Sequence, residues 1–519
     1  MKTTSIPFAA SIAASVALAS AVAFAQAGAR EIVSVGPAGV RGNFGSSDPS
    51  VSDDARFVAF YSSATNLVSP ATASGYVQVF VRDRELGTTT LVSHASGSPT
   101  VGASGGHSWH PVVSADGSLV VFQSGATDLV SPATTGQQVF AWHRSDGSIE
   151  LVSCQDGSTT VGGNGNSYEP VIADDNRHVA FSSDASDLVA SDANGFSDIF
   201  VRDLEDATSE LVSLSDADAA ANQGSYSPSI SADGHLVTFV SSATNLLATA
   251  TAVGQIYLRD RTSGTTTLIS ENYVETGEGN DTCGESIITP DGAYVLFMSA
   301  ATDLVAEVTA NAQVFLRDVA AGTTALVSVS TAGVMGDSYS GASSGDGYGS
   351  GLSSDARYVS FNSYATNLVP GDTNGTYDVF ARDMVDEETV LASRALDGGV
   401  ADNMSGATDI TPDGRFLVFD SLATNLVADA GPTSTNQIYL LDLLGPPAEP
   451  DAGVDGGADT DTDADTDADT DTDADADTDA DADTDADAGA NGNGDDGCGC
   501  SAAGSRAADT GTLLSILFL

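Results

Sequence analysis

Residues 227–240 read Ser-Pro-Ser-Ile-Ser-Ala-Asp-Gly-His-Leu-Val-Thr-Phe-Val, and this stretch decides the fold of the 519-residue chain. It predicts a short strand at 227–231, a turn at 232–234 and a second strand at 235–240. Side chains in the second strand alternate between two faces, as they do in a sheet. Because an Asp-Gly turn between two strands forms an antiparallel hairpin, the stretch indicates β-structure.

The same pattern occurs seven times between Pro49 and Asp442, with 58 to 64 residues from one copy to the next. In the copy above, a third strand at 255–260 and a fourth at 266–270 complete the unit. Repeats of this size built only from short strands are arranged radially in a propeller. The predicted fold class is therefore an all-β, seven-bladed β-propeller over residues 26–445, with four antiparallel strands per blade. The phenylalanines that mark the copies are Phe60, Phe122, Phe181, Phe239, Phe297, Phe361 and Phe419.

The seventh repeat lacks a fourth strand of its own. Its third strand, 437–442, is followed by Pro446-Pro447 rather than by another strand. Near the beginning of the chain, residues 31–35 (Glu-Ile-Val-Ser-Val) match outer strands such as 91–93 (Leu-Val-Ser). We expect this segment to pair onto the seventh blade, which closes the ring and removes an open sheet edge.

Two polar positions recur in all seven repeats. An Asp stands six residues before the marker phenylalanine, and we interpret it as the acceptor for backbone amides of its hairpin turn. An Asn or Asp stands six residues after the phenylalanine, and we interpret it as an Asx turn that ends the second strand. Repetition favours a folding role for both, because a catalytic site breaks the symmetry of a repeat. The first set is Asp54, Asp116, Asp175, Asp233, Asp291, Asp355 and Asp413, and the second is Asn66, Asp128, Asp187, Asn245, Asp303, Asn367 and Asn425.

The element Pro-x-x-Ser-x-Asp-Gly-x-x-x-x-Phe at 228–239, with Gln-Ile-Tyr-Leu-Arg-Asp at 255–260, resembles the TolB-type propeller repeat. The resemblance covers about 410 residues, from Glu31 to Asp442. It implies the fold. Such repeats serve in periplasmic scaffolds, in gating domains of peptidases, in a lyase and in many uncharacterised surface proteins, so the resemblance implies no single function.

The chain is strongly acidic, with a formal net charge of −55. Residues 449–496 contribute 20 of the negative charges and no positive one, which leaves −35 for the rest. Lys2 is the only lysine. Such a surface does not suit the phosphate backbone, so nucleic acid is not expected as a partner.

The two ends of the chain predict export. Residues 1–25 have the basic start, apolar stretch and Ala-Phe-Ala site of a secretory signal peptide. Residues 446–497 form an Asp-rich spacer that is predicted to be disordered. Residues 498–519, with Cys498, Cys500 and an apolar end, resemble the myxobacterial carboxyl-terminal sorting tail, which implies processing and retention at the cell surface. We expect a monomer without a transmembrane body, at the outer cell surface or, alternatively, simply secreted.

A candidate calcium motif occurs twice, as Asp-x-Asn-Gly-x-x-Asp at 192–198 and at 372–378. Oxygens at the first, third and seventh positions around a glycine turn can surround Ca²⁺, the one cofactor that the sequence suggests. In the other five repeats the last position is Gln. The alternative interpretation is an Asn-Gly turn that leads into the third strand. The candidate ligands are Asp192, Asn194, Asp198, Asp372, Asn374 and Asp378.

Aromatic residues between the blades are candidates for stacking on a sugar or a peptide, because they combine a ring with a polar edge. They are Trp109, Tyr168, Tyr226, Tyr339 and Tyr348, which we place in long loops at one mouth of the central channel. His107 and His110 flank Trp109 and are interpreted as loop decoration. Cys154 and Cys283 are expected to be unpaired, and no catalytic residue is assigned.

These observations favour an exported, non-enzymatic propeller that binds a protein or a glycan, or serves as a scaffold. The alternative is a secreted polysaccharide hydrolase or lyase that acts through the channel. The channel distinguishes the two, because clustered His, Arg and carboxylates favour an enzyme, whereas a Ser- and Gly-lined mouth favours binding.

Overall fold

The computed structural model describes residues 30–72, 75–248, 253–307, 310–341, 349–428 and 435–445. The predicted signal peptide, spacer and sorting tail, with Cys498 and Cys500, lie outside these residues, as does Tyr348. Within the described ranges no helix is long and apolar enough to span a bilayer. Cys154 and Cys283 are both buried and unpaired, as expected.

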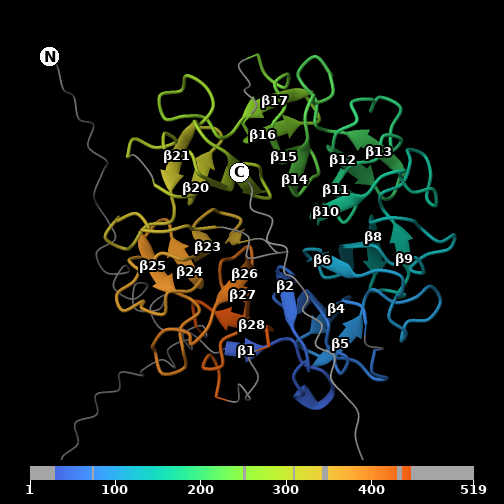
Figure 1. Cartoon of the computed structure of the whole chain (residues 1–519), viewed down its shortest axis with the longest axis horizontal. Helices are drawn as coiled ribbons and strands as arrows, with labels where there is room; N and C mark the ends of the chain where they lie inside the picture. Colours follow the sequence, from blue (N-terminus) through green and yellow to red (C-terminus); the bar gives the residue numbers. More distant parts are fainter. Residues whose placement is uncertain are drawn as a thin grey trace, which may run out of the picture. The chain divides into compact units, whose positions relative to one another are not determined.

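Seven four-stranded antiparallel sheets surround a central channel, with the first strand of each sheet innermost (Figure 1). The predicted seven-bladed propeller is confirmed. The one helical element in the described ranges is a 3-10 turn, η1 (Pro37–Gly39). The strands are, blade by blade, β2 (Ser46–Val51), β3 (Phe57–Ser62), β4 (Gln78–Asp83) and β5 (Thr88–Leu91); β6 (Ser108–Val113), β7 (Leu119–Ser124), β8 (Gln138–His143) and β9 (Ile149–Leu151); β10 (Ser167–Ile172), β11 (His178–Ser183), β12 (Asp198–Asp203) and β13 (Thr208–Leu211); β14 (Ser225–Ile230), β15 (Leu236–Ser241), β16 (Gln255–Asp260) and β17 (Thr265–Leu268); β18 (Cys283–Ile288), β19 (Tyr294–Ser299), β20 (Gln313–Asp318) and β21 (Thr323–Leu326); β22 (Ser350–Leu352), β23 (Tyr358–Ser363), β24 (Asp378–Asp383) and β25 (Glu388–Leu391); and β26 (Ser405–Ile410), β27 (Phe416–Ser421), β28 (Gln437–Asp442) and β1 (Arg30–Ile32).

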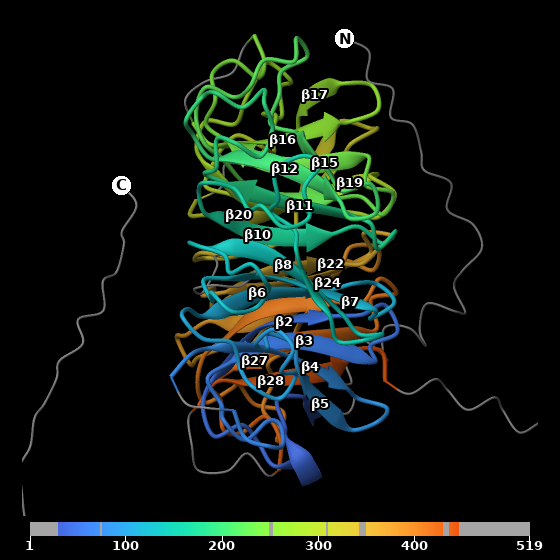
Figure 2. The same ribbon diagram turned by 90° about the vertical axis from the view of Figure 1, so that its right-hand side faces the viewer.

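The hydrophobic core lies between neighbouring blades, which face one another in the side view (Figure 2). Each marker phenylalanine is buried and stacks on an aromatic residue of the third strand, with ring centroids 5.7–6.0 Å apart. Phe122, for example, pairs with Phe140 in its own sheet and contributes to a cluster that also contains Ala59 and Val79 of the preceding blade. Apolar residues are therefore needed on both faces of every sheet.

The ring is closed by the beginning of the chain, as predicted. β1 pairs antiparallel with β28, so that Ile32 lies opposite Tyr439. Beyond the strand, the Val33 amide donates to the Ile438 carbonyl at 2.8 Å, and the Ser34 hydroxyl donates to Gln437 at 2.7 Å. The first and last parts of the propeller thus share one sheet, which leaves no open edge between them.

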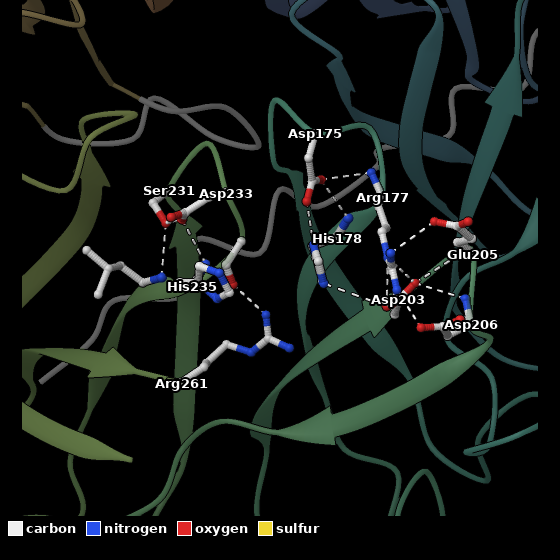
Figure 3. A network of polar contacts seen from close by, with 12 residues as sticks. Asp175, Arg177, His178, Asp203, Glu205, Asp206, Ser231, Asp233, His235 and Arg261 are labelled. Carbon is white, nitrogen blue, oxygen red and sulfur yellow. Dashed lines mark hydrogen bonds and ion pairs between the residues drawn. The ribbon is translucent and has the colours of Figure 1, made fainter. Parts of the chain in front are cut away.

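The recurring turn Asp has the predicted role in all seven blades: one carboxylate oxygen accepts a hydrogen bond from the backbone N–H two residues later. Figure 3 shows this for Asp233, which accepts bonds from the His235 N–H at 3.0 Å and from the Ser231 hydroxyl at 2.7 Å. In the preceding blade Ala173 replaces the serine, and the carboxylate of Asp175 bonds instead to the backbone and ring of His178.

Replacement of a turn Asp should destabilise the propeller modestly. Asp233→Ala removes two hydrogen bonds to a charged group, and because Asp233 is exposed we expect the free energy of unfolding to fall by about 1 kcal/mol. Urea unfolding measures the change. The control is Glu307→Ala, which removes an exposed carboxylate outside the turns. An equal loss in both variants would contradict the assigned role.

The second recurring position behaves differently from the prediction. The side-chain oxygen of this Asn or Asp accepts a hydrogen bond from a backbone N–H 23, 24 or 30 residues earlier in the chain, as in the 2.9 Å bond from Asn43 to Asn66. The residue therefore ties the loop after the second strand to the loop that enters the same blade. The prediction of a folding device holds, but the local Asx turn is wrong, because the partner is close in space and distant in sequence.

Candidate functional site in the central channel

The channel is lined by the first strand of every blade, and in six of the seven blades a β-bulge interrupts this strand. In the first four blades the pattern is Ser-x-x-Pro, and the residue before the proline has a positive φ between 47° and 57°. A bulge re-aims the side chain that it carries, and left-handed backbone at residues other than glycine is concentrated at functional sites. The four residues are Asp48, His110, Glu169 and Ser227.

The charged side chains at the position before the proline form a cluster. Glu285 in the first strand of the fifth blade also belongs to this cluster. His110 Nδ1 lies 3.0 Å from Asp48 Oδ2. The Glu169 carboxylate accepts a 2.7 Å bond from the Ser227 N–H, and Glu285 accepts a 3.2 Å bond from the Gly349 N–H. Glu285 also interacts electrostatically with Glu169, His110 and Asp48. Since Glu285 on the fifth blade interacts with residues of the first, second and third blades, these side chains converge across the channel.

The environment favours the protonated form of several of these acids. Burial, helped by the charges of Glu169 and Asp48, raises the pKa of Glu285 to about 8. Burial also raises the pKa of Asp409 to about 6 and that of Asp420 to about 7, and Asp48 adds to both shifts. Burial and mutual repulsion therefore oppose the simultaneous ionisation of these carboxyl groups.

Beside the cluster lies a cavity of about 170 Å³. Its walls are mainly apolar, with the three prolines Pro49, Pro111 and Pro228, while Asp48 and Asp409 supply carboxylates. No arginine lines the cavity within the part of the chain that the structure describes. In the same ranges no three His, Cys, Asp or Glu side chains form a metal-binding group. The channel thus combines apolar walls with negative charge.

Three of the predicted aromatic residues lie next to the cluster. Trp109, Tyr168 and Tyr226 each occupy the second position of a first strand, in β6, β10 and β14, directly before His110, Glu169 and Ser227. They belong to strands rather than to the loops where we expected them, because the first strands begin earlier than the sequence suggested. His110 is likewise a strand residue paired with Asp48, so its interpretation as loop decoration is wrong.

The surroundings of the three aromatic residues differ. Trp109 stacks on His107 with ring centroids 5.4 Å apart. The Tyr168 hydroxyl donates to Asp184 at 3.4 Å, and Tyr226 is 47% exposed. Tyr339 belongs to the sixth blade, where its carbonyl accepts a bond from the Tyr364 N–H, and it is not part of the first-strand set.

Both candidate calcium motifs lie in loops between the second and third strands. Asn194 Nδ2 donates to Asp198 Oδ2 in the third blade, and Asn374 Nδ2 donates to Asp378 Oδ2 at 2.7 Å in the sixth. Asp192 and Asp372 interact electrostatically with Asp198 and Asp378, respectively. The structure therefore brings together the three members of each motif.

Sequence analysis missed Asp48, Glu169 and Glu285. The residue before the proline differs from one repeat to the next, unlike the recurring Asp and Phe, and Glu285 stands in a repeat that lacks this proline. For Asp48 and Glu169 the available signal was this variability: a charged residue inside a Ser-x-x-Pro frame that is shared by the first four repeats, on strands that all face one axis.

No protein-family model and no curated protein matches the chain. Its fold is similar to that of solved structures, among them a putative TolB from Agrobacterium tumefaciens, with 14% identity over 55% of this chain and 80% of that one and a TM-score of 0.34. TolB from Acinetobacter baumannii gives 13% identity, 68% and 64% coverage and a TM-score of 0.35. An oligogalacturonate lyase from Vibrio parahaemolyticus gives 11% identity, 80% and 96% coverage and a TM-score of 0.47.

Fold and channel together define a β-propeller with an acidic central channel. At these identities the likeness to the solved structures concerns the fold alone, so the function has to be argued from the residues of this chain.

Proposed function

We propose that this chain is an exported, non-enzymatic propeller at the outer cell surface, which binds a positively charged segment of a partner protein at its channel. The supporting observation is the convergence of Asp48, Glu169 and Glu285, together with three aromatic residues at the second position of the first strands β6, β10 and β14. Ammonium and guanidinium groups bind to carboxylates through charge-assisted hydrogen bonds and also to aromatic faces. Export and surface attachment are proposed from residues 1–25 and 498–519.

The raised pKa of Glu285 makes this binding dependent on pH. A cation next to Glu285 favours the ionised carboxylate, so binding near neutral pH releases a proton. The affinity for a cationic ligand should therefore increase as the pH rises toward about 8, which is the pKa of Glu285 in the protein without ligand. An acidic glycan such as a polyuronate would be repelled by the same charges, whereas a neutral glycan remains compatible with the aromatic residues.

Polysaccharide hydrolysis is the second candidate. Glu285, which the channel keeps partly protonated, faces further carboxylates at Asp48 and Glu169. A protonated carboxyl group opposite an ionised one is the acid and base arrangement of glycoside hydrolases. This candidate requires a neutral substrate, because the channel is acidic.

Tryptophan fluorescence of the purified full chain can test the binding proposal. The chain has two tryptophans, of which Trp142 is 4% exposed, so a ligand at the channel mouth should change mainly the emission of Trp109. We expect Lys- and Arg-rich peptides to change the emission and Asp- and Glu-rich peptides to leave it unchanged. The double variant Glu169→Gln/Glu285→Gln should weaken binding by about tenfold or more, because it removes two charged partners.

The control variant Glu307→Gln removes one exposed carboxylate outside the channel and should bind like the parent. Binding that is equal in all three proteins would contradict the proposal and indicate attraction to the acidic chain as a whole. Release of reducing ends from a neutral polysaccharide, lost in Glu285→Gln alone, would support the hydrolase instead.

A further inference from the structure

The 192–198 loop of the third blade differs from the corresponding loops that precede a Gln. In the first blade, Gln78 Oε1 accepts the Ser93 hydroxyl at 2.6 Å, and Gln78 Nε2 donates to the Ala103 carbonyl at 2.9 Å. This single amide links the third strand to the fourth strand and to the loop that enters the next blade. Similar bonds are made by Gln138, Gln255 and Gln313.

In the third blade two residues replace this glutamine. Asp198 Oδ1 accepts the Ser213 hydroxyl at 2.6 Å, and Asn194 Nδ2 donates to the Ala221 carbonyl at 2.8 Å. The same Asn194 nitrogen also donates to Asp198 Oδ2. The structural alternative, an Asn-Gly turn before a strand, therefore accounts for Asn194 and Asp198.

The Asn-Gly turn does not account for Asp192. This side chain is 6% exposed, and both carboxylate oxygens are buried without a hydrogen-bond partner. The Asn194 N–H lies close enough to favour the ionised form, but it makes no bond of ordinary geometry to either oxygen. A buried carboxylate without a donor is strongly unfavourable unless a proton or a cation compensates its charge.

A second acid lies close to Asp192. Burial, followed by the charge of Asp192, raises the pKa of Asp198 to about 6, and burial raises that of Asp192. In the sixth blade Asp372 is 7% exposed, and burial, followed by the charge of Asp372, raises the pKa of Asp378 to about 6. Two buried carboxyl groups next to an amide and a backbone carbonyl provide the oxygen ligands that Ca²⁺ prefers.

We propose that the 192–198 loop binds a divalent cation, with Ca²⁺ the best match, through Asp192 and Asp198, and that the 372–378 loop binds a second one. Side-chain and backbone oxygens of Asn194 and Ala221 and water molecules complete the shell. The cation ties the loop between two strands to the loop that enters the next blade. The bound cation stabilises the ring of blades and takes no part in ligand binding in the channel.

Thermal unfolding of the full chain with chelator, with millimolar Mg²⁺ and with millimolar Ca²⁺ tests the proposal. We expect Ca²⁺ to raise the Tm by on the order of 5 °C, as for a ligand present well above its Kd, and Mg²⁺ to raise it less. In Asp192→Asn the rise should be about halved, and in Asp192→Asn/Asp372→Asn it should vanish. With chelator Asp192→Asn should melt at the same temperature as the parent or higher, because it removes an uncompensated charge.

A decrease of the Tm by Asp192→Asn in Ca²⁺ that is absent or reversed in chelator separates a cation site from a structural role. A structural role predicts one shift under all conditions and would overturn the proposal, as would a Tm of the parent that does not respond to Ca²⁺. The matched control is Asp397→Asn, which removes an exposed carboxylate that bonds only to the nearby Gly399 N–H. It should keep the full response.

A second variant, Asp198→Gln, guards against misfolding of Asp192→Asn, because Gln occupies this position in five other blades. It should fold and lose half of the Ca²⁺ response. An unchanged response in Asp198→Gln would also overturn the proposal. The acidic spacer is the same in every variant, so cations condensed on it cannot produce these differences. The channel variants Glu169→Gln and Glu285→Gln should keep the response, which distinguishes this site from the proposed ligand site.

Discussion

Deletion of residues 30–35 should abolish cooperative folding of the propeller. The deletion removes β1 and, with it, the three residue pairs between β1 and β28. It also removes Val33, which is fully buried and packs with Phe60 and Ile438 between the first and seventh blades. Burial of one such side chain is worth about 2 kcal/mol, and the hydrogen bonds of Val33 and Ser34 are lost too. The sum approaches the total stability of a typical domain, about 5–15 kcal/mol.

Circular dichroism melting and size-exclusion chromatography can compare a chain that begins at Arg30 with one that begins at Gly36. We expect a sharp transition and a monomer for the first, and a broad transition with association through the open edge of β28 for the second. A point variant makes the same test without shortening the chain: Val33→Asp should be strongly destabilising, whereas Val40→Asp, at a residue 56% exposed, should have little effect. Equal melting of the two shortened chains would refute ring closure as a source of stability.

The fold could be predicted because seven copies of one unit repeat the same signals. A single Asp-containing hairpin such as the one at Asp233 occurs in many folds, but seven such hairpins at nearly constant spacing leave few architectures. The seventh repeat lacks one strand, and the segment 31–35 is a strand without a blade, so the sequence predicts that this segment completes the seventh blade. Local pattern and global closure agreed, which is what makes a prediction from sequence secure.

The channel could not be predicted in the same way. Asp48, Glu169 and Glu285 are more than 50 residues apart from one another in sequence, and only the ring brings them together. The bulge that aims Asp48 and Glu169 inward depends on backbone geometry that the sequence shows only as a proline. Similarly, the sequence predicts a local turn at Asn66, because it does not show that the hydrogen-bond partner, Asn43, lies in a different loop. Local rules predicted the elements, whereas the site depends on contacts between elements.

The propeller should be more stable at about pH 5 than at about pH 8, which is the reverse of what ordinary surface ion pairs would give. Burial raises the pKa of four aspartates to about 6, that of Asp420 to about 7 and that of Glu285 to about 8. The unfolded chain releases these protons near pH 4, so between about pH 4 and 8 the folded state binds more protons than the unfolded state. Its stability must then fall as the pH rises through this range. The four aspartates are Asp53, Asp198, Asp378 and Asp409.

Aspartates with lowered pKa values set the lower limit of the pH range in which the propeller is most stable. Asp83, Asp203 and Asp383 are buried, which by itself would raise their pKa values, but hydrogen bonds and ion pairs with arginine lower them below the ordinary range. Their contribution to stability is present above about pH 4 and is lost as the pH falls below it. The two sets together place the maximum of stability near pH 4 to 5.

Asp420→Asn isolates one member of the first set. Asp420 is 7% exposed and accepts a 2.9 Å hydrogen bond from Asn436, which the oxygen of an asparagine can also accept. The variant should therefore differ least from the parent at about pH 4 or below, where Asp420 carries a proton in the folded and the unfolded state, and should exceed it increasingly as the pH rises to about 8, where the folded parent has to bury a charge. Each unit of pKa shift is worth about 1.4 kcal/mol, so the gain at the higher pH should reach at least this size in urea unfolding. Asp397→Asn, on an exposed loop, should give no such difference, and a variant Asp420→Asn that is less stable at both pH values would mean that this carboxylate is held ionised by partners stronger than its burial.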